Sequence, residues 1–198
     1  LPFFRGKDSG VALADVLERI EQAQAFMYKM KMTMTGAMMP DIPADEIEME
    51  SIVIISDEYG MKCEMTITDA NTGKEMAQKM YLLPEQKMMI TVMPEQKKYM
   101  RMEFDDDLLV RMKKQNNDPR DMVKQIMSCE YTELSRSVID GVEVEGFQTT
   151  DPAFAGGAMD ENLNVRLWVD AESWLPVCVE MDMKMNEQMQ MHGIIYDY

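Results

Sequence analysis

An alternation of apolar and polar residues runs through most of the chain and predicts half-buried strands. It begins at Phe26, from which apolar side chains recur at every second position as far as Met34. It returns in the segment MKCEMTIT at 61–68, which the turn DANTG at 69–73 follows. Successive side chains of a strand point to opposite faces, so each segment has one apolar face. The Asp, Asn and Gly of the turn favour a hairpin.

Two similar segments then follow, LPEQKMMITV from Leu83 and MPEQKKYMRM from Met93. Each combines a Pro-Glu-Gln turn with a strand, which is the spacing of an antiparallel meander. More strands are predicted after Cys129, with a turn at Asp140-Gly141. They are YTELSRSVI, VEVEGFQTT, LNVRLWVD, LPVCVEMDMKM and a last strand that reaches Tyr198.

Helical spacing occurs in three places. The segment SGVALADVLERIEQAQ has apolar residues three and four apart, with Ser9 as the expected N-cap, and it leads directly into the first strand. FDDDLLVRMKKQ has acids at its start and bases toward its end, which matches the helix dipole. NDPRDMVKQIMS has Asp118 as N-cap and Pro119 in the first turn. Its predicted apolar side is Met122, Val123, Ile126 and Met127.

Methionine is unusually frequent on these faces, and the whole chain contains 25 methionines in 198 residues. In LPVCVEMDMKM the residues Val177 to Met185 at odd positions share a face. A turn at 186–188 would pair Met185 with Met189 and Met183 with Met191. The simplest interpretation is that these methionines form the inside of a curved sheet.

Three functional interpretations of that face stay open. The unbranched thioether adapts to irregular shapes, so the methionines could line a pocket for varied apolar ligands, or they could fill the solid core of a structural or interaction domain. Thioethers also bind Cu(I), and M-x-M repeats are what such a site would show. Alternation in a strand produces the same repeats without any metal.

Charge and composition limit the remaining classes. The net charge of −16 disfavours nucleic acid and anionic surfaces, and apolar residues make up 46% of the chain. The first residues, LPFFRGK, are interpreted as a linker or trimmed N-terminus at 1–9, with one domain at 10–198. Three cysteines lie far apart, and Cys63 and Cys178 are expected to be buried hydrophobic residues.

Catalytic and metal motifs are not found in the sequence. His192 is the single histidine, so no His-based zinc cluster or nucleophile-histidine pair is indicated. DANTG resembles the start of a calcium loop, but Met80 stands where the bidentate Glu is needed. Asp105 to Asp107 suit a solvated helix start. We therefore expect no enzyme activity, no cofactor and no metal ligands.

The chain resembles the LolA/LolB-like lipoprotein carrier superfamily, which includes RseB-like periplasmic sensors. The resemblance is carried by ALADVLERIEQAQAFMYKMKMTMTG, by MYLLPEQKMMITVMPEQKKYMRM, and by IDGVEVEGFQTTDP followed by VRLWVDAESWLPVCVEM. It implies an α+β fold in which an N-terminal helix and short helices cover the concave face of a strongly curved antiparallel sheet, an unclosed β-barrel. It also implies a cavity that holds acyl chains without catalysis. An N-terminal Cys for lipidation and a second RseB-type domain are not found.

The combined expectation is a non-catalytic carrier or sensor domain outside the cytoplasm. Its partners would be a hydrophobic ligand or lipoprotein, and an envelope membrane protein, but not nucleic acid. The residues expected to line its cavity are Met30, Met32, Met34, Met65, Met100, Met102, Leu108, Met112, Met122, Ile126, Met181 and Met183.

Overall fold

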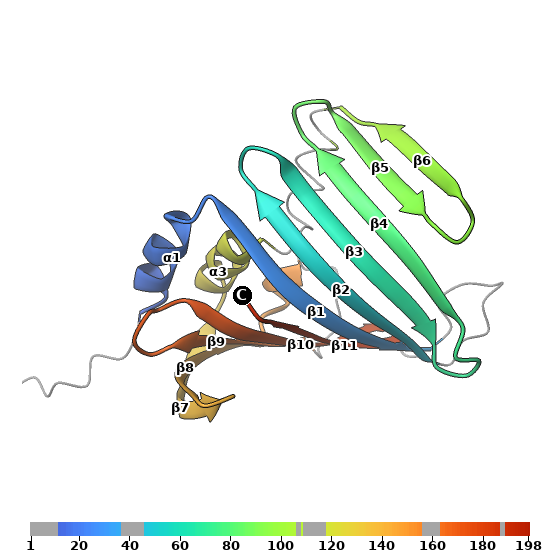
Figure 1. Ribbon diagram of the computed structural model, residues 1–198. Coiled ribbons are helices and arrows are strands. Elements are labelled where there is room, and N and C mark those ends of the chain that lie inside the picture. Colours follow the sequence, from blue (N-terminus) through green and yellow to red (C-terminus); the bar gives the residue numbers. More distant parts are fainter. Residues whose placement is uncertain (1–11, 37–45, 106–107, 109–117, 156–162, 187–188) are drawn as a thin grey trace, which may run out of the picture.

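The computed structural model describes residues 12–36, 46–105, 108, 118–155, 163–186 and 189–198 (Figure 1). The helical elements among them are α1 (Leu13–Glu21), α3 (Pro119–Ser128) and the 3-10 turn η1 (Pro152–Ala155). The strands are β1 (Ala25–Thr35), β2 (Glu46–Ser56), β3 (Gly60–Asp69), β4 (Glu75–Leu83), β5 (Met88–Met93), β6 (Lys98–Glu103), β7 (Tyr131–Ile139), β8 (Val142–Thr149), β9 (Asn164–Asp170), β10 (Pro176–Asn186) and β11 (Met189–Tyr196).

All described strands belong to one antiparallel sheet of 11 strands, in the order β6-β5-β4-β3-β2-β1-β11-β10-β9-β8-β7. The chain folds outward from the central pair of β1 and β11, which joins its two ends. The edge strands β6 and β7 do not pair with each other, so the curved sheet stays open (Figure 1). This architecture, with helices on the concave face, confirms the predicted fold class.

Cross-strand register defines which side chains share the concave face. Tyr28 is buried there and lies opposite Val53, which lies opposite Cys63. Two residues further along β1, Met30 lies opposite Ile195 on β11 and Ser51 on β2. Directly paired residues point to the same side of a sheet, so the even positions of β1 all face the concave side.

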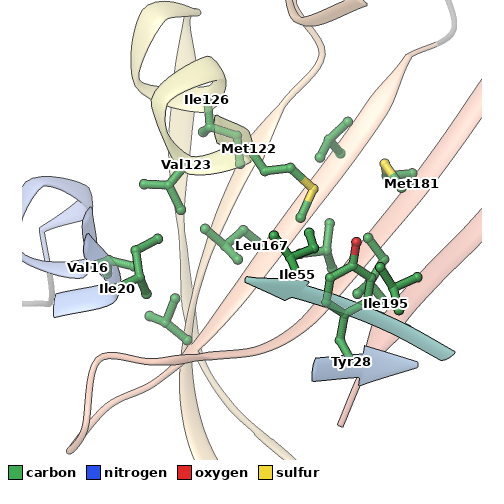
Figure 2. Close-up of a cluster of buried hydrophobic side chains, with 14 of the residues drawn as sticks. Val16, Ile20, Tyr28, Ile55, Met122, Val123, Ile126, Leu167, Met181 and Ile195 are labelled. Atoms are coloured by element: carbon green, nitrogen blue, oxygen red, sulfur yellow. The ribbon is translucent and has the colours of Figure 1, made fainter. Parts of the chain in front are cut away.

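The helices α1 and α3 contact each other and bury their apolar faces against one end of that side (Figure 1). Figure 2 shows Val16 and Ile20 of α1, and Val123 and Ile126 of α3, pointing toward the sheet residue Leu167. All are at most 1% exposed. The cluster continues across the strands through Tyr28, Ile55, Met61, Leu82, Phe147 and Ile195. We call this part of the concave face the helix-covered end.

Both described helices differ from the sequence prediction in detail. The first begins at Leu13 after Ala12, which makes no side-chain cap, and it ends at Glu21. The expected N-cap Ser9 lies outside the described residues. Asp118 does cap α3, since its Oδ1 accepts a hydrogen bond from the Arg120 amide at 2.9 Å. The prediction for Met127 was wrong, because the helix turns this side chain outward, where it is 39% exposed.

Arg120 attaches α3 to the sheet. Its guanidinium donates to both carboxylate oxygens of Asp57, at 3.0 and 2.8 Å, and its Nε donates to Asp118 at 3.0 Å. The same group lies 5.2 Å from the centre of the Phe26 ring. These partners raise the pKa of Arg120 further above its usual range, so the side chain is always charged.

The predicted helix at 104–115 lies largely outside the described residues.

The predicted hairpin turns are present. Asp69 Oδ1 accepts bonds from the amides of Asn71 and Thr72, and Asp140 and Gly141 have positive φ angles. The two Pro-Glu-Gln turns each end in a lysine with positive φ, Lys87 and Lys97. Backbone bonds from Lys87 to Pro84 and from Lys97 to Pro94 close them.

The predicted pairing at the last hairpin was correct in one half and wrong in the other. Met183 does lie opposite Met191. Met185 does not pair with Met189, because the register shifts between Lys184 and Asn186 and places Asn186 opposite Met189. A β-bulge of this kind moves one residue out of the ladder and changes the register beyond it.

No helix in the described part of the chain is long and apolar enough to cross a membrane.

Candidate functional site: the methionine end of the concave face

The concave face changes character along the strands. Beyond the helix-covered end, a row of directly paired residues crosses six strands from Met181 on β10 to Met76 on β4. Its members are Met181, Gly193, Met32, Met49, Ile67 and Met76. The next row continues with Met183, Met191, Met34 and Ile47. Methionine is therefore the main side chain on this part of the sheet.

We call Met30, Met32, Met34, Met49, Met65, Ile67, Met76, Met183 and Met191 the methionine end. Met32, Met49, Ile67 and Met76 are only partly buried. Among the described residues these four neither belong to the buried core cluster nor pack against it. Met30, Met65 and Met183 border that cluster. The methionine end is thus an apolar surface that the described core leaves partly open.

The opposite, convex face of the same strands carries paired charges beside the exposed apolar side chains Met27, Ile52 and Ile54. Lys31 and Glu50 form an ion pair at 3.2 Å, and Glu64 accepts from Lys62 at 3.0 Å and from Lys79 at 3.1 Å. The two lysines lower the pKa of Glu64. His192 Nδ1 lies 2.7 Å from Asp182 Oδ1 on this outer side. Alternation along each strand separates these charges from the methionines.

Titratable groups between the two ends are held neutral. Burial raises the pKa of the Tyr28 phenol and of the Cys63 thiol. On the convex face, where Cys178 pairs with Tyr196, burial and the nearby Glu180 carboxylate raise the pKa of the Cys178 thiol to about 11. Cys63 and Cys178 are both buried and free, which confirms the expectation that they behave as small hydrophobic residues. The border of the methionine end therefore adds no charge at neutral pH.

A hollow of about 600 Å³ lies beside α3, away from the methionine end. Ile55, Met61 and Leu82 contribute apolar lining, and its polar lining includes Glu21, Asp57, Asp118, Arg120, Asp121 and Lys124. Both basic groups are already paired, Arg120 with Asp57 and Asp118, and Lys124 with Glu21 at 2.8 Å. With four carboxylates and two paired cations, this groove does not suit an anionic head group.

The residues predicted from sequence fall into three groups, apart from one that the structure does not describe. Met30, Met32, Met34, Met65 and Met183 lie on the methionine end. Met122, Ile126 and Met181 are buried in the core, at 5%, 1% and 5% exposure, and Leu108 packs against it. On the edge strand β6, Met102 is half-buried and Met100 is 52% exposed. Met112 lies outside the described residues.

Sequence reasoning missed Met49, Ile67, Met76 and Met191 as members of this surface, although Met191 was placed on the shared face. The signal for Met49 was present, because EIEMESIVII alternates Ile47, Met49, Ser51 and Val53 in the pattern of a strand. The structure confirms that strand as β2. Met49 then enters the surface because β2 pairs with β1 in the register that places it opposite Met32.

The architecture is shared with a solved structure. The crystal structure of the Mycobacterium tuberculosis lipoprotein LppX superposes with a TM-score of 0.52 at 13% identity, over 92% of this chain and 93% of LppX. The chain shares the fold of LppX. LprF from Mycobacterium bovis matches with a TM-score of 0.45 at 13% identity, over 93% and 91% of the two chains. A DUF1329 family protein from Desulfovibrio piger gives 0.38 at 11%, over 93% and 88%.

No protein-family model and no curated protein sequence matches the chain. The comparison with LppX therefore concerns the fold alone.

Proposed function

We propose that the protein binds a hydrophobic ligand, a lipid or the acyl chain of a lipoprotein, on the methionine end. It would act outside the cytoplasm as a non-catalytic carrier or sensor domain. One observation carries the proposal: the concave face stays apolar through Met32, Met49, Ile67 and Met76, where the described core no longer covers it. Apolar side chains that border the core and stay accessible are the usual lining of a ligand site.

Methionine suits such a site for a physical reason. Its unbranched side chain has several rotatable bonds and a polarisable sulfur, so the surface can fit acyl chains of different shape. Burial of a ligand methylene contributes about 0.8 kcal/mol. The paired charges of the convex face are separated from the ligand by the sheet itself, so no buried charge opposes binding.

The fold and the sequence resemblance support the same proposal. A curved sheet with helices over one end of its concave face agrees with the architecture implied by the LolA/LolB-like resemblance. On this basis we propose that residues 10–198 form one LolA-like domain, preceded by the segment 1–9. A lipoprotein, or an envelope membrane protein that delivers or receives the ligand, would be its partner.

Native mass spectrometry of the purified protein, followed by organic extraction and lipid analysis, tests the proposal. We expect a co-purifying acyl species. The variant Met49→Asp places a charge on the methionine end and should lose that species. Ile52→Asp, on the convex face of the same strand at a position 43% exposed in the wild type, is the matched control and should keep it.

A clean apo mass, with no uptake of a fluorescent fatty acid by the folded wild-type protein, would contradict the proposal. The methionines would then be packing residues of an interaction domain. Equal loss of ligand in both variants would also contradict it, because the binding surface would then not be confined to the concave side. Circular dichroism of each variant shows whether the fold is retained.

A further inference from the structure

Three methionines lie directly opposite one another on adjacent strands. Met34 on β1 pairs with Met191 on β11, and Met191 pairs with Met183 on β10. Directly opposed side chains of an antiparallel sheet have Cβ atoms about 5 Å apart. A methionine sulfur can move several ångströms from its Cβ by rotation about the side-chain bonds. Three thioether sulfurs can therefore meet above the middle strand.

The neighbouring row leaves room for them to do so. Gly193 lies between Met32 and Met181, and it has no side chain where every direct neighbour has a thioether. A Cβ built at Gly193 would meet no atom closer than the Met181 methyl carbon, at 3.7 Å. Alanine would thus fit, so close packing does not require the glycine. Glycine inside a strand costs about 0.5–1 kcal/mol relative to alanine. Gly193 is itself buried, so the gap that its missing side chain leaves is a small space bordered by the Met181 methyl group and not an opening of the surface.

We infer that Met34, Met183 and Met191 form a binding site for a soft monovalent cation, Cu(I), with Met32 and Met181 bordering the gap at Gly193. Thioethers are neutral soft donors that select Cu(I) over hard cations. The oxygen and nitrogen donors of these strands, such as Asp182 and His192, point to the convex side, so they do not join the set. The net charge of −16 attracts cations to the protein without determining which one binds.

Leucine variants separate Cu(I) binding, which needs the sulfur atoms, from ligand binding that needs only an apolar surface. Leucine keeps the apolar surface and nearly the volume of methionine, at a cost usually below about 1.5 kcal/mol, but it removes the sulfur. The triple variant Met34→Leu, Met183→Leu, Met191→Leu should keep the fold and lose Cu(I) binding. The control triple Met80→Leu, Met89→Leu, Met93→Leu changes concave-face methionines on β4 and β5 that lie outside the methionine end, and it should keep both the fold and Cu(I) binding.

The experiment is an anaerobic titration of the full chain with Cu(I) against bicinchoninate as the competing chelator. We expect the wild type and the control triple to withdraw about one equivalent of Cu(I), and the Met34/Met183/Met191 triple to bind at least tenfold more weakly. Zn²⁺ should not compete. X-ray absorption at the copper edge should show sulfur neighbours alone.

Gly193→Leu provides a second variant that keeps all the sulfurs. Filling the gap should weaken Cu(I) binding by at least tenfold while leaving the methionine count unchanged. The inference is overturned if the wild type withdraws no Cu(I) from the chelator, if both triples bind equally well, or if Gly193→Leu binds like the wild type. Retention of the fold is checked by circular dichroism, and acyl binding is measured on the same samples.

Discussion

The two ends of the concave face belong to the same strands and differ in what contacts them. At the helix-covered end, Tyr28, Val53 and Leu82 belong to the same buried core cluster as the apolar faces of α1 and α3, at 1%, 4% and 2% exposure. At the methionine end, Met32, Met49 and Met76 are partly exposed and lie outside the described core. The same strand periodicity therefore produces a packed core in one place and an accessible apolar surface in the other.

The residue types differ accordingly. The helix-covered end is built mainly from Val, Ile, Leu and aromatic side chains, whose few rotamers suit one fixed packing. The other end is built mainly from methionine, which adopts many shapes. Methionine is thus concentrated where the described core does not cover the sheet. Each of the following changes tests that difference.

The largest expected effect is at the helix-covered end. Ile126→Ala removes a side chain that is 1% exposed and packed between α3 and the sheet, so it should lower the free energy of unfolding by about 2–5 kcal/mol. Met76→Ala, a truncation of similar size on the partly open surface, should cost less than about 1 kcal/mol. Urea denaturation measures both. Equal costs would mean that the two ends are packed alike.

Two strand glycines provide the next comparison. A Cβ at Gly146 would lie 2.5 and 2.7 Å from atoms of the Trp168 ring, so Gly146→Ala should destabilise by about 1–3 kcal/mol. Gly193→Ala meets nothing closer than 3.7 Å and should be neutral or stabilising by up to about 1 kcal/mol. Thermal denaturation measures both. A strongly destabilised Gly193→Ala would show that the gap in the methionine surface is not there.

The ion pairs of α3 are expected to contribute less to the free energy of unfolding. Arg120→Met removes the guanidinium bonds to Asp57 and Asp118 and leaves both carboxylates in place, with an expected loss of about 1–2 kcal/mol. Lys124→Met, which removes the half-exposed pair with Glu21, should change stability by less than about 1 kcal/mol. Chemical denaturation measures the stability of the two variants, and a larger loss for Lys124→Met than for Arg120→Met would contradict the role given to Arg120.

The smallest effect is an alkaline one on the convex face, where Cys178 pairs with Tyr196. Burial raises the pKa of Cys178 from 9.0 in its reference state to about 11. The unfolded thiol therefore ionises first, and the stability held by the neutral thiol is complete below pH 9 and falls as the pH rises toward 11. Melting temperatures between pH 8 and 11 should decline, and less steeply in Cys178→Ala. An unchanged slope in that variant would contradict the assignment.

Much of this fold follows from local patterns that are visible in the amino-acid sequence. Alternation from Phe26 onward, the Pro-Glu-Gln turns and the Asp140-Gly141 turn each specify a local conformation, and each is present. Asp118 and Pro119 likewise specify the start of α3. Local rules work here because a hairpin or a helix cap is decided by residues that are close in sequence.

The surface itself depends on long-range register, which local patterns do not contain. Met49 joins Met32 only because β2 pairs with β1 in one particular alignment. The bulge near Lys184 changed the partner of Met189 from Met185 to Asn186, and nothing in the alternation marks it. The exposure of Met127 depends on how α3 is rotated against the sheet, which its own periodicity left undecided by one position.

The central claim, that the methionine end and not the helix-covered end receives a hydrophobic ligand, is tested most directly by NMR of methyl-labelled methionines. Titration with a fatty acid should shift the methyl signals of Met32, Met49 and Met76, and nuclear Overhauser contacts should join them to the ligand. Signals of the buried Met61 and Met122 should stay in place. Shifts confined to the exposed Met27 and Met100, or no shifts at saturating ligand, would contradict the claim.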